Sequence, residues 1–131
     1  MELTPLLRAD RQVIERYGAS GFRVAGVVYR GAILVFPDCT LPWAAASTAV
    51  ISWESLAPVV EHGGVQILLL GLGRTMGAIP RDLRTPFRAA GIVLEAMDTG
   101  AACRTFNVLL AEDRRVAAAL LPPRQLSADD G

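Results

Sequence analysis

The chain has 131 residues, of which 52% are hydrophobic and 20% charged, so its length and composition are those of one globular domain and exclude a disordered chain. Its 13 basic and 13 acidic side chains give a formal net charge of zero, so no overall field attracts nucleic acid or an acidic membrane. Because aromatic residues are not interleaved with basic ones, we expect no nucleic-acid partner.

The first eleven residues lack the continuous apolar core of a signal peptide, because Pro5, Arg8 and Asp10 interrupt them. Elsewhere no apolar run approaches the ~18 residues that a membrane-spanning helix requires. The sequence therefore predicts a cytoplasmic protein with no membrane span.

The N-terminal half is predicted to contain strands. Val13–Tyr17 fits either an edge strand or the last turn of a short helix, and the glycines that follow favour the strand. Phe22–Tyr29 is rich in valine and aromatic residues, so it predicts one strand, with a bulge or a close backbone approach at Gly26. A tight turn then leads into Ala32–Phe36, the expected second arm of an N-terminal β-hairpin. We expect residues 37–43 to form a loop, because each of their two prolines removes a hydrogen-bond donor.

The middle of the chain is harder to interpret. Residues 44–51 are ambiguous, with a short strand possible at the end. A helix of about ten residues is expected to begin at Ser52, or nearer Ser55 if Pro58 has to lie in its first turn.

The clearest pattern follows from there. Val65–Leu70 is almost wholly apolar without alternation, which indicates a strand buried on both faces near the centre of a mostly parallel sheet. Arg81–Ala90 predicts a helix that buries Leu83 and Phe87, four residues apart. Ile92–Met97 is then the next strand, and the crossover between the two strands should be right-handed.

A dense polar turn leads from that strand into a helix over residues 101–111, with Thr99 in the position of an N-cap. Val116–Leu121 is the last predicted strand. Because the strands should be parallel, we expect the loop Gly71–Arg74 and the turn Asp98–Gly100 to emerge at the same end of the sheet.

The predicted elements lie in residues 13–121, which we expect to form a single α/β domain. Residues 1–12 are predicted to be an N-terminal arm. Residues 122–131 are predicted to be a disordered tail, because Pro122-Pro123 end the last strand.

A crevice between the two loops is the predicted binding site, because ligands commonly bind at the carboxyl ends of neighbouring parallel strands. Glycine-rich loops and helix N-termini offer backbone amides to an anion, and two arginines could add charge. The candidate residues of this cleft are Gly71, Gly73, Arg74, Asp98, Thr99, Cys103 and Arg104.

Each of these residues also has a purely structural interpretation. The glycines could simply permit a tight turn, since the chain has neither GxGxxG nor a phosphate-binding GxxxxGK[ST] motif. Asp98 could cap the helix, which we favour, or hold Arg74 or Arg104 in an ion pair. Cys103, in the first helical turn, could be a nucleophile, but a thiol in the core is the favoured interpretation.

Metal and cofactor chemistry is not expected. The two cysteines, Cys39 and Cys103, lie in neither a CxxC motif nor a cluster with metal-ligand spacing. The single histidine, His62, argues against a zinc site built from histidines. We therefore predict no metal, no cofactor, no assembled catalytic set and two free thiols in a reducing compartment.

Several segments together resemble the Mth938-like family of small bacterial and archaeal proteins. The most specific is Met97–Asn107, and the others are Phe22–Gly26, Val35–Asp38, Pro42-Trp43 and Leu69–Gly73. The resemblance implies a three-layer α/β fold around a mixed, mostly parallel sheet of about five strands, one of them antiparallel. Leu72 and Phe106 depart from the family pattern, which has threonine and tyrosine there.

The resemblance also implies a function. In animals the family includes the mitochondrial complex I assembly factor 3 and an adipogenesis-associated protein, and it has no established enzymatic activity. We therefore expect a non-catalytic domain that binds a protein partner, in the assembly or membrane targeting of a respiratory complex. The alternative is a protein, conceivably an enzyme, that binds a small molecule or an anion in the predicted cleft. A homodimer is conceivable through an exposed edge of the hairpin over residues 22–36.

Overall fold

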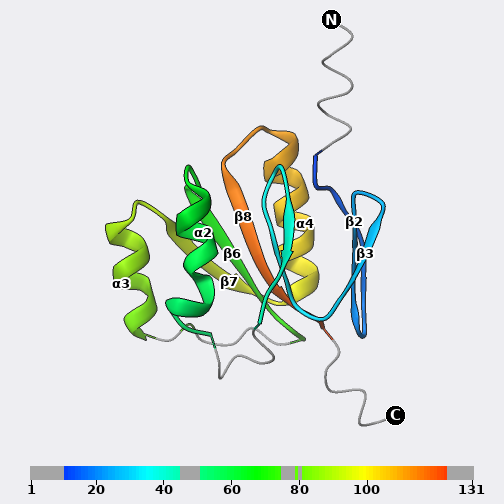
Figure 1. The fold of residues 1–131 in the computed structure, drawn as a ribbon, viewed down its shortest axis with the longest axis horizontal. Coiled ribbons are helices and arrows are strands. Elements are labelled where there is room, and N and C mark those ends of the chain that lie inside the picture. Colours follow the sequence, from blue (N-terminus) through cyan, green and yellow to red (C-terminus); the bar gives the residue numbers. More distant parts are fainter. Residues whose placement is uncertain (1–10, 45–50, 75–78, 80, 124–131) are drawn as a thin grey trace, which may run out of the picture.

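The computed structural model describes residues 11–44, 51–74, 79 and 81–123. They form two sheets, one of three strands in the order β1-β2-β3 and one of five strands in the order β5-β4-β8-β6-β7. Helices cover both faces of the larger sheet, as Figure 1 shows. The predicted α/β class with a mixed five-stranded sheet is confirmed.

The smaller sheet is an antiparallel meander of β1 (Ile14–Gly18), β2 (Gly21–Val24) and β3 (Val27–Arg30). The strand predicted near Val13–Tyr17 is confirmed, but the prediction of a single strand over Phe22–Tyr29 was wrong. Ala25 and Gly26 both have positive φ, +48° and +83°, and form a two-residue turn rather than a bulge. Such turns match the twist of the strands that they join.

The next hairpin belongs to the larger sheet. It joins β4 (Ile33–Val35) to β5 (Thr40–Pro42), and β4 also pairs with β8. The prediction that Ala32–Phe36 pairs with the preceding strand was therefore wrong, and so was the loop predicted over residues 37–43. Pro42 is tolerated in a strand because β5 lies at the edge of its sheet.

The remaining elements agree with the sequence to within a few residues. Pro58 lies in the first turn of its helix, which begins after a short 3₁₀ turn, as the later of the two predicted starts requires. In chain order the elements are η2 (Glu54–Leu56), α2 (Ala57–His62), β6 (Ile67–Leu72), α3 (Arg81–Ala89), β7 (Val93–Met97), α4 (Thr99–Ala111) and β8 (Val116–Leu121).

The last strand of the chain lies at the centre of the larger sheet. β8 is parallel to β6 and antiparallel to β4, and all six of its residues are buried. Since β6 is also parallel to β7, and β5 is antiparallel to β4, only β4 runs against the other four strands. The single antiparallel strand implied by the family resemblance is thus β4.

Two hydrophobic cores lie on the two faces of this sheet. One core joins the sheet to α2 and α3 through residues such as Val59, Phe87 and Leu68. The other joins it to α4 and to the three-stranded sheet through residues such as Phe22 and Phe106. In Figure 1, α2 and α3 accordingly lie on one side of the sheet, and α4 with β2 and β3 on the other.

Some predictions fall at or beyond the limits of the described residues. Arg11 is held by the Asp113 carboxylate and the Leu110 carbonyl, each at 2.9 Å, whereas residues 1–10 of the predicted arm are not described. Residues 45–50 and 124–131 also lie outside the described ranges. Within those ranges no helix is long and apolar enough to cross a membrane.

The Ala25-Gly26 turn gives a test of the fold. Ala25→Asn should raise the free energy of unfolding by about 0.5–1 kcal/mol, because asparagine tolerates a left-handed backbone that costs alanine about 1–2 kcal/mol. Gly26→Ala should lower it by about 1 kcal/mol for the opposite reason. Urea unfolding measures both changes, and shifts of the same sign in the two variants would contradict the turn.

Candidate functional site

The predicted cleft is occupied by a buried hydrogen-bonded joint around Thr99. The Thr99 hydroxyl accepts the Gly73 amide at 2.9 Å and donates to the Leu121 carbonyl at 2.6 Å. The Thr99 amide donates to the Gly73 carbonyl at 2.8 Å. Thr99 is fully buried, so one side chain connects the ends of β6 and β8 to the start of α4.

Asp98, not Thr99, is the N-cap of α4, so the predicted cap was wrong by one residue. Its backbone is extended, and its carboxylate accepts the Ala101 amide at 2.9 Å. Thr99 is the first residue of α4, and its hydroxyl bonds to Gly73 and Leu121 at the ends of β6 and β8 instead of capping the helix. The favoured capping role of Asp98 is confirmed, and none of the ion pairs found among the described residues includes it.

Gly71 lets the helix lie directly on the sheet. A Cβ atom there would lie 2.8 Å from the Leu120 side chain and 3.1 Å from the Thr99 Cα. Gly73 has a φ of +86°, which favours glycine. The two glycines predicted to cradle an anion therefore have structural reasons of their own.

Cys103 is 2% exposed, in the core between α4 and the sheets. Burial raises the pKa of its thiol to about 12, which keeps it protonated at neutral pH. The favoured interpretation as a core thiol is confirmed, because a protonated buried thiol is a poor nucleophile.

Two polar side chains of α4 fasten the three-stranded sheet. The Asn107 side chain accepts the Ile14 amide and donates to the Ile14 carbonyl, both at 2.9 Å, as a neighbouring strand would. Arg104 donates to the Tyr17 hydroxyl at 3.2 Å. Asn107 lies in the most specific segment of the sequence, but helical spacing alone gave no sign of a strand for it to hold.

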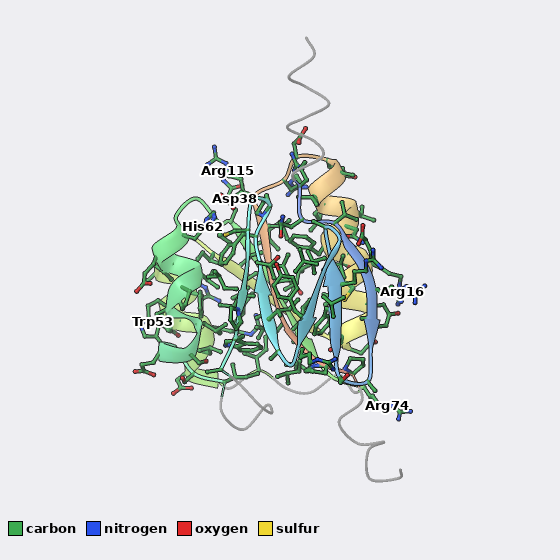
Figure 2. All side chains as sticks on the ribbon, turned by 45° about the vertical axis from the view of Figure 1, so that its right-hand side comes forward. Arg16, Asp38, Trp53, His62, Arg74 and Arg115 are labelled. Carbon is green, nitrogen blue, oxygen red and sulfur yellow. The ribbon has the colours of Figure 1, made fainter. Side chains whose placement is uncertain are left out.

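Of the predicted cleft residues, Gly71, Gly73, Asp98 and Thr99 lie around this joint at one end of the sheet, whereas Cys103 packs into the core and Arg104 bonds to Tyr17. Figure 2 shows Arg74 at that end, where it is exposed. However, the amides of Gly73, Thr99 and Ala101 are already bonded within the protein and are not available to an anion. Binding of a ligand there stays a prediction.

A second polar cluster lies at the opposite end of the sheet, where Figure 2 shows Asp38 and His62. The His62 Nε2 lies 2.8 Å from the Asp38 carboxylate, and its Nδ1 lies 3.1 Å from the Gly63 carbonyl. The ring stacks on Phe36 at 4.2 Å between centroids. One oxygen, nitrogen or sulfur atom from each of Asp38, Cys39 and His62 lies within 4.8 Å of the other two.

The cluster is electrostatically coupled. The hydrogen bond from His62 lowers the pKa of Asp38. Burial lowers the pKa of His62, but its bonds to Asp38 and to the Gly63 carbonyl outweigh burial, and the pKa is raised overall. Burial and the neighbouring Asp38 charge raise the pKa of Cys39. Sequence reasoning missed this cluster because it considered Cys39 and His62 separately.

Comparison with protein families finds one that matches most of the chain. The model of the family described as "Protein of unknown function (DUF498/DUF598)" matches residues 14–121. The chain belongs to this family. The match spans β1 to β8 and includes the Thr99 joint.

Relatives of the DUF498 chain include named assembly factors. An uncharacterised protein of Rhodobacter capsulatus is 39% identical over 83% of this chain and 83% of its own length. The NADH dehydrogenase [ubiquinone] 1 alpha subcomplex assembly factor 3 of Xenopus tropicalis is 34% identical over 92% of this chain and 67% of its own. The chain spans 64% of the Danio rerio protein of the same name, at 36% identity over 85% of this chain.

Solved structures of DUF498 relatives agree with the fold. The crystal structure of a Bartonella henselae protein, described as an outer membrane protein, is 38% identical with a TM-score of 0.80, over 87% of this chain and 97% of that one. The solution structure of a Mth938-like domain from Bordetella pertussis is 28% identical with a TM-score of 0.75, over 92% of this chain and 91% of that one. The Mth938-like fold implied by the sequence is confirmed, whereas a cytoplasmic location stays a prediction.

The Thr99 joint can be tested by removing one hydroxyl. Thr99→Val should lower the free energy of unfolding by about 2–4 kcal/mol, because it leaves a buried amide and a buried carbonyl without this partner. Thr99→Ser keeps the hydroxyl and should cost only about 1 kcal/mol, for the lost methyl group. Equal losses in the two variants, measured by urea unfolding, would show that the hydroxyl is not essential.

The two cysteines should differ in reactivity. Iodoacetamide at about pH 8 should modify Cys39 in the folded protein, slowly because its pKa is raised but measurably because the thiol is half-buried, and should spare Cys103, whose thiol is buried. Mass spectrometry of peptides from folded and urea-unfolded protein measures both. Rapid modification of Cys103 in the folded protein would contradict its burial.

Proposed function

We propose that this chain is a non-catalytic protein-binding factor that takes part in assembling a respiratory complex of the complex I type. The observation that carries the proposal is its similarity, along most of its length, to proteins named as NADH dehydrogenase assembly factor 3. The chain covers about two thirds of the length of those proteins, 67% and 64%.

The joint around Thr99 supports a binding role over a catalytic one. In the most specific segment of the sequence, the side chains of Asp98, Thr99 and Asn107 all bond to the protein's own backbone. Cys103 is buried in the core. These groups stabilise the fold and hold the three-stranded sheet in place, and none of them is offered to a substrate.

The outer face of the three-stranded sheet is the surface that we assign to the partner. Arg16, Arg23 and Val28 lie opposite one another in register, and Arg30 lies opposite Gly21 on the same face. A hollow of about 390 Å³ is lined by these arginines together with Gly18 and Gly21.

The chemistry of this outer sheet face, defined as Arg16, Arg23, Val28 and Arg30, fits an acidic protein segment. Val28 is 67% exposed in the middle of it. Only Arg23 has an acidic partner among the ion pairs found in the described residues, at 3.2 Å from Glu15. Figure 2 shows Arg16 pointing away from the sheet into solvent. The face thus combines an apolar centre with positive charge.

Crosslinking and capture test the proposal. The tagged full chain, expressed in cells that encode it, should capture subunits or assembly intermediates of NADH dehydrogenase. The double variant Arg16→Glu/Arg30→Glu should reduce this capture about tenfold or more, because like charges would then face an acidic partner. Quantitative mass spectrometry measures the captured subunits.

The matched control is Arg88→Glu/Arg114→Glu, which reverses two exposed arginines on other parts of the surface. It should leave capture unchanged. If the unaltered chain captures no NADH dehydrogenase subunit, the proposed function is wrong. If both double variants lose capture equally, the function stands but the outer sheet face is not the binding surface.

A further inference from the structure

The turn between β4 and β5 places two metal-binding side chains next to each other. The Phe36 amide donates to the Cys39 carbonyl at 2.8 Å, which closes a tight turn with Pro37 and Asp38 inside it. Thr40 is anchored in turn by a 2.7 Å bond to the Gln12 side chain. The positions of Asp38 and Cys39 are therefore set by the backbone of a closed hairpin.

The third side chain comes from another element. His62 is the last residue of α2, and its ring lies flat on Phe36, with 5° between the two ring planes. Its Nδ1 faces the Gly63 carbonyl and its Nε2 faces the Asp38 carboxylate, so loss of the Nε2 proton would leave a lone pair directed at Asp38 and Cys39 while Nδ1 keeps its proton. Histidines that bind metals usually donate their other ring N–H to such a carbonyl or carboxylate, which fixes tautomer and orientation.

We propose that Asp38, Cys39 and His62 bind one zinc ion or a similar divalent transition-metal ion. The carboxylate, the thiolate and the neutral imidazole Nε2 would be the protein ligands, and a water molecule the fourth. Binding releases the thiol proton, and any proton on Nε2, to solvent. This set of oxygen, sulfur and nitrogen donors suits zinc, and its two anionic members balance the charge of the ion.

The geometry needs only small movements. Zinc bonds of about 2.0–2.3 Å in a tetrahedron place ligand atoms roughly 3.3–3.8 Å apart. The Asp38–His62 contact of 2.8 Å must open slightly, and the longest separation in the cluster, below 4.8 Å, must close by about 1 Å. The side chain of Asp38 is 71% exposed, so it can turn without disturbing the core.

Space for the ion's water is available beside the cluster. Of the three proposed ligands, His62 lines a cavity of about 300 Å³, together with residues that include Gly63, Gly64, Arg114 and Arg115. Figure 2 shows Arg115 near Asp38 and His62, far from Arg74 at the other end of the sheet. The site is independent of the outer sheet face.

A cobalt titration tests the site, because Co²⁺ replaces Zn²⁺ and reports its ligands by absorbance. Tag-free full chain, stripped of metal and reduced, should bind one equivalent of Co²⁺ at about pH 8. Binding should produce the near-ultraviolet charge-transfer band of a cobalt–thiolate bond and the visible bands of four-coordinate cobalt. Added Zn²⁺ should displace the cobalt and abolish both.

The variants identify the ligands. Cys39→Ser should abolish the charge-transfer band, and His62→Gln or Asp38→Asn should weaken binding about tenfold or more, since the loss of even an outer-shell group costs about 10–100-fold. Cys103→Ala is the matched control and should keep the band. Circular dichroism confirms that each variant is folded.

Each outcome decides the proposal. If the unaltered chain gives no charge-transfer band, or if the band survives in Cys39→Ser, there is no such site. If His62→Gln and Asp38→Asn both bind cobalt as tightly as the unaltered chain, the metal is held by the cysteine alone and the proposed ligand set is wrong. None of these results affects the capture of NADH dehydrogenase subunits.

Discussion

The hydroxyl group of Thr99 links the ends of two strands to the start of a helix. The Thr99 side chain joins the end of β6, through the Gly73 amide, to the end of β8, through the Leu121 carbonyl. Because Thr99 is also the first residue of α4, the same bonds fix where the helix begins. The position of α4 then decides where Asn107 lies, and Asn107 holds β1. The three-stranded sheet is thus positioned, through one helix, by a buried threonine.

The second half of the fold could be predicted because burial there leaves a clear pattern. Residues 65–70 are apolar without alternation, since β6 lies between two parallel neighbours, and Leu83 and Phe87 mark the buried side of α3. The first half could not, because its pairing is set by turns. A run of valine and aromatic residues conceals the Ala25-Gly26 turn, and alanine is not a residue that signals positive φ.

The cleft near Gly73 and the cluster of Asp38, Cys39 and His62 also differ in how far the sequence predicts them. Parallel strands bring their carboxyl ends together, so the neighbourhood of Gly73 and Asp98 could be predicted from topology alone. What could not be predicted is that Thr99 uses its hydroxyl on the sheet, because Asp98 and Thr99 are both good capping residues. The cluster of Asp38 and His62 depends on the hairpin that leads into β5, which Pro37 and Pro42 made look like a loop. The spacing of Asp38 and His62 along the chain does not indicate that they meet.

The central position of β8 has a consequence for biosynthesis. The strand that fills the middle of the larger sheet is synthesised after the seven other described strands. Until it arrives, β4 and β6 have no common neighbour, and Thr99 has no carbonyl of Leu121 to bond. Before β8 has been made, the nascent chain therefore holds two separate, incomplete halves with exposed strand edges. A chain truncated before β8 would lack the strand that joins the two halves of the sheet.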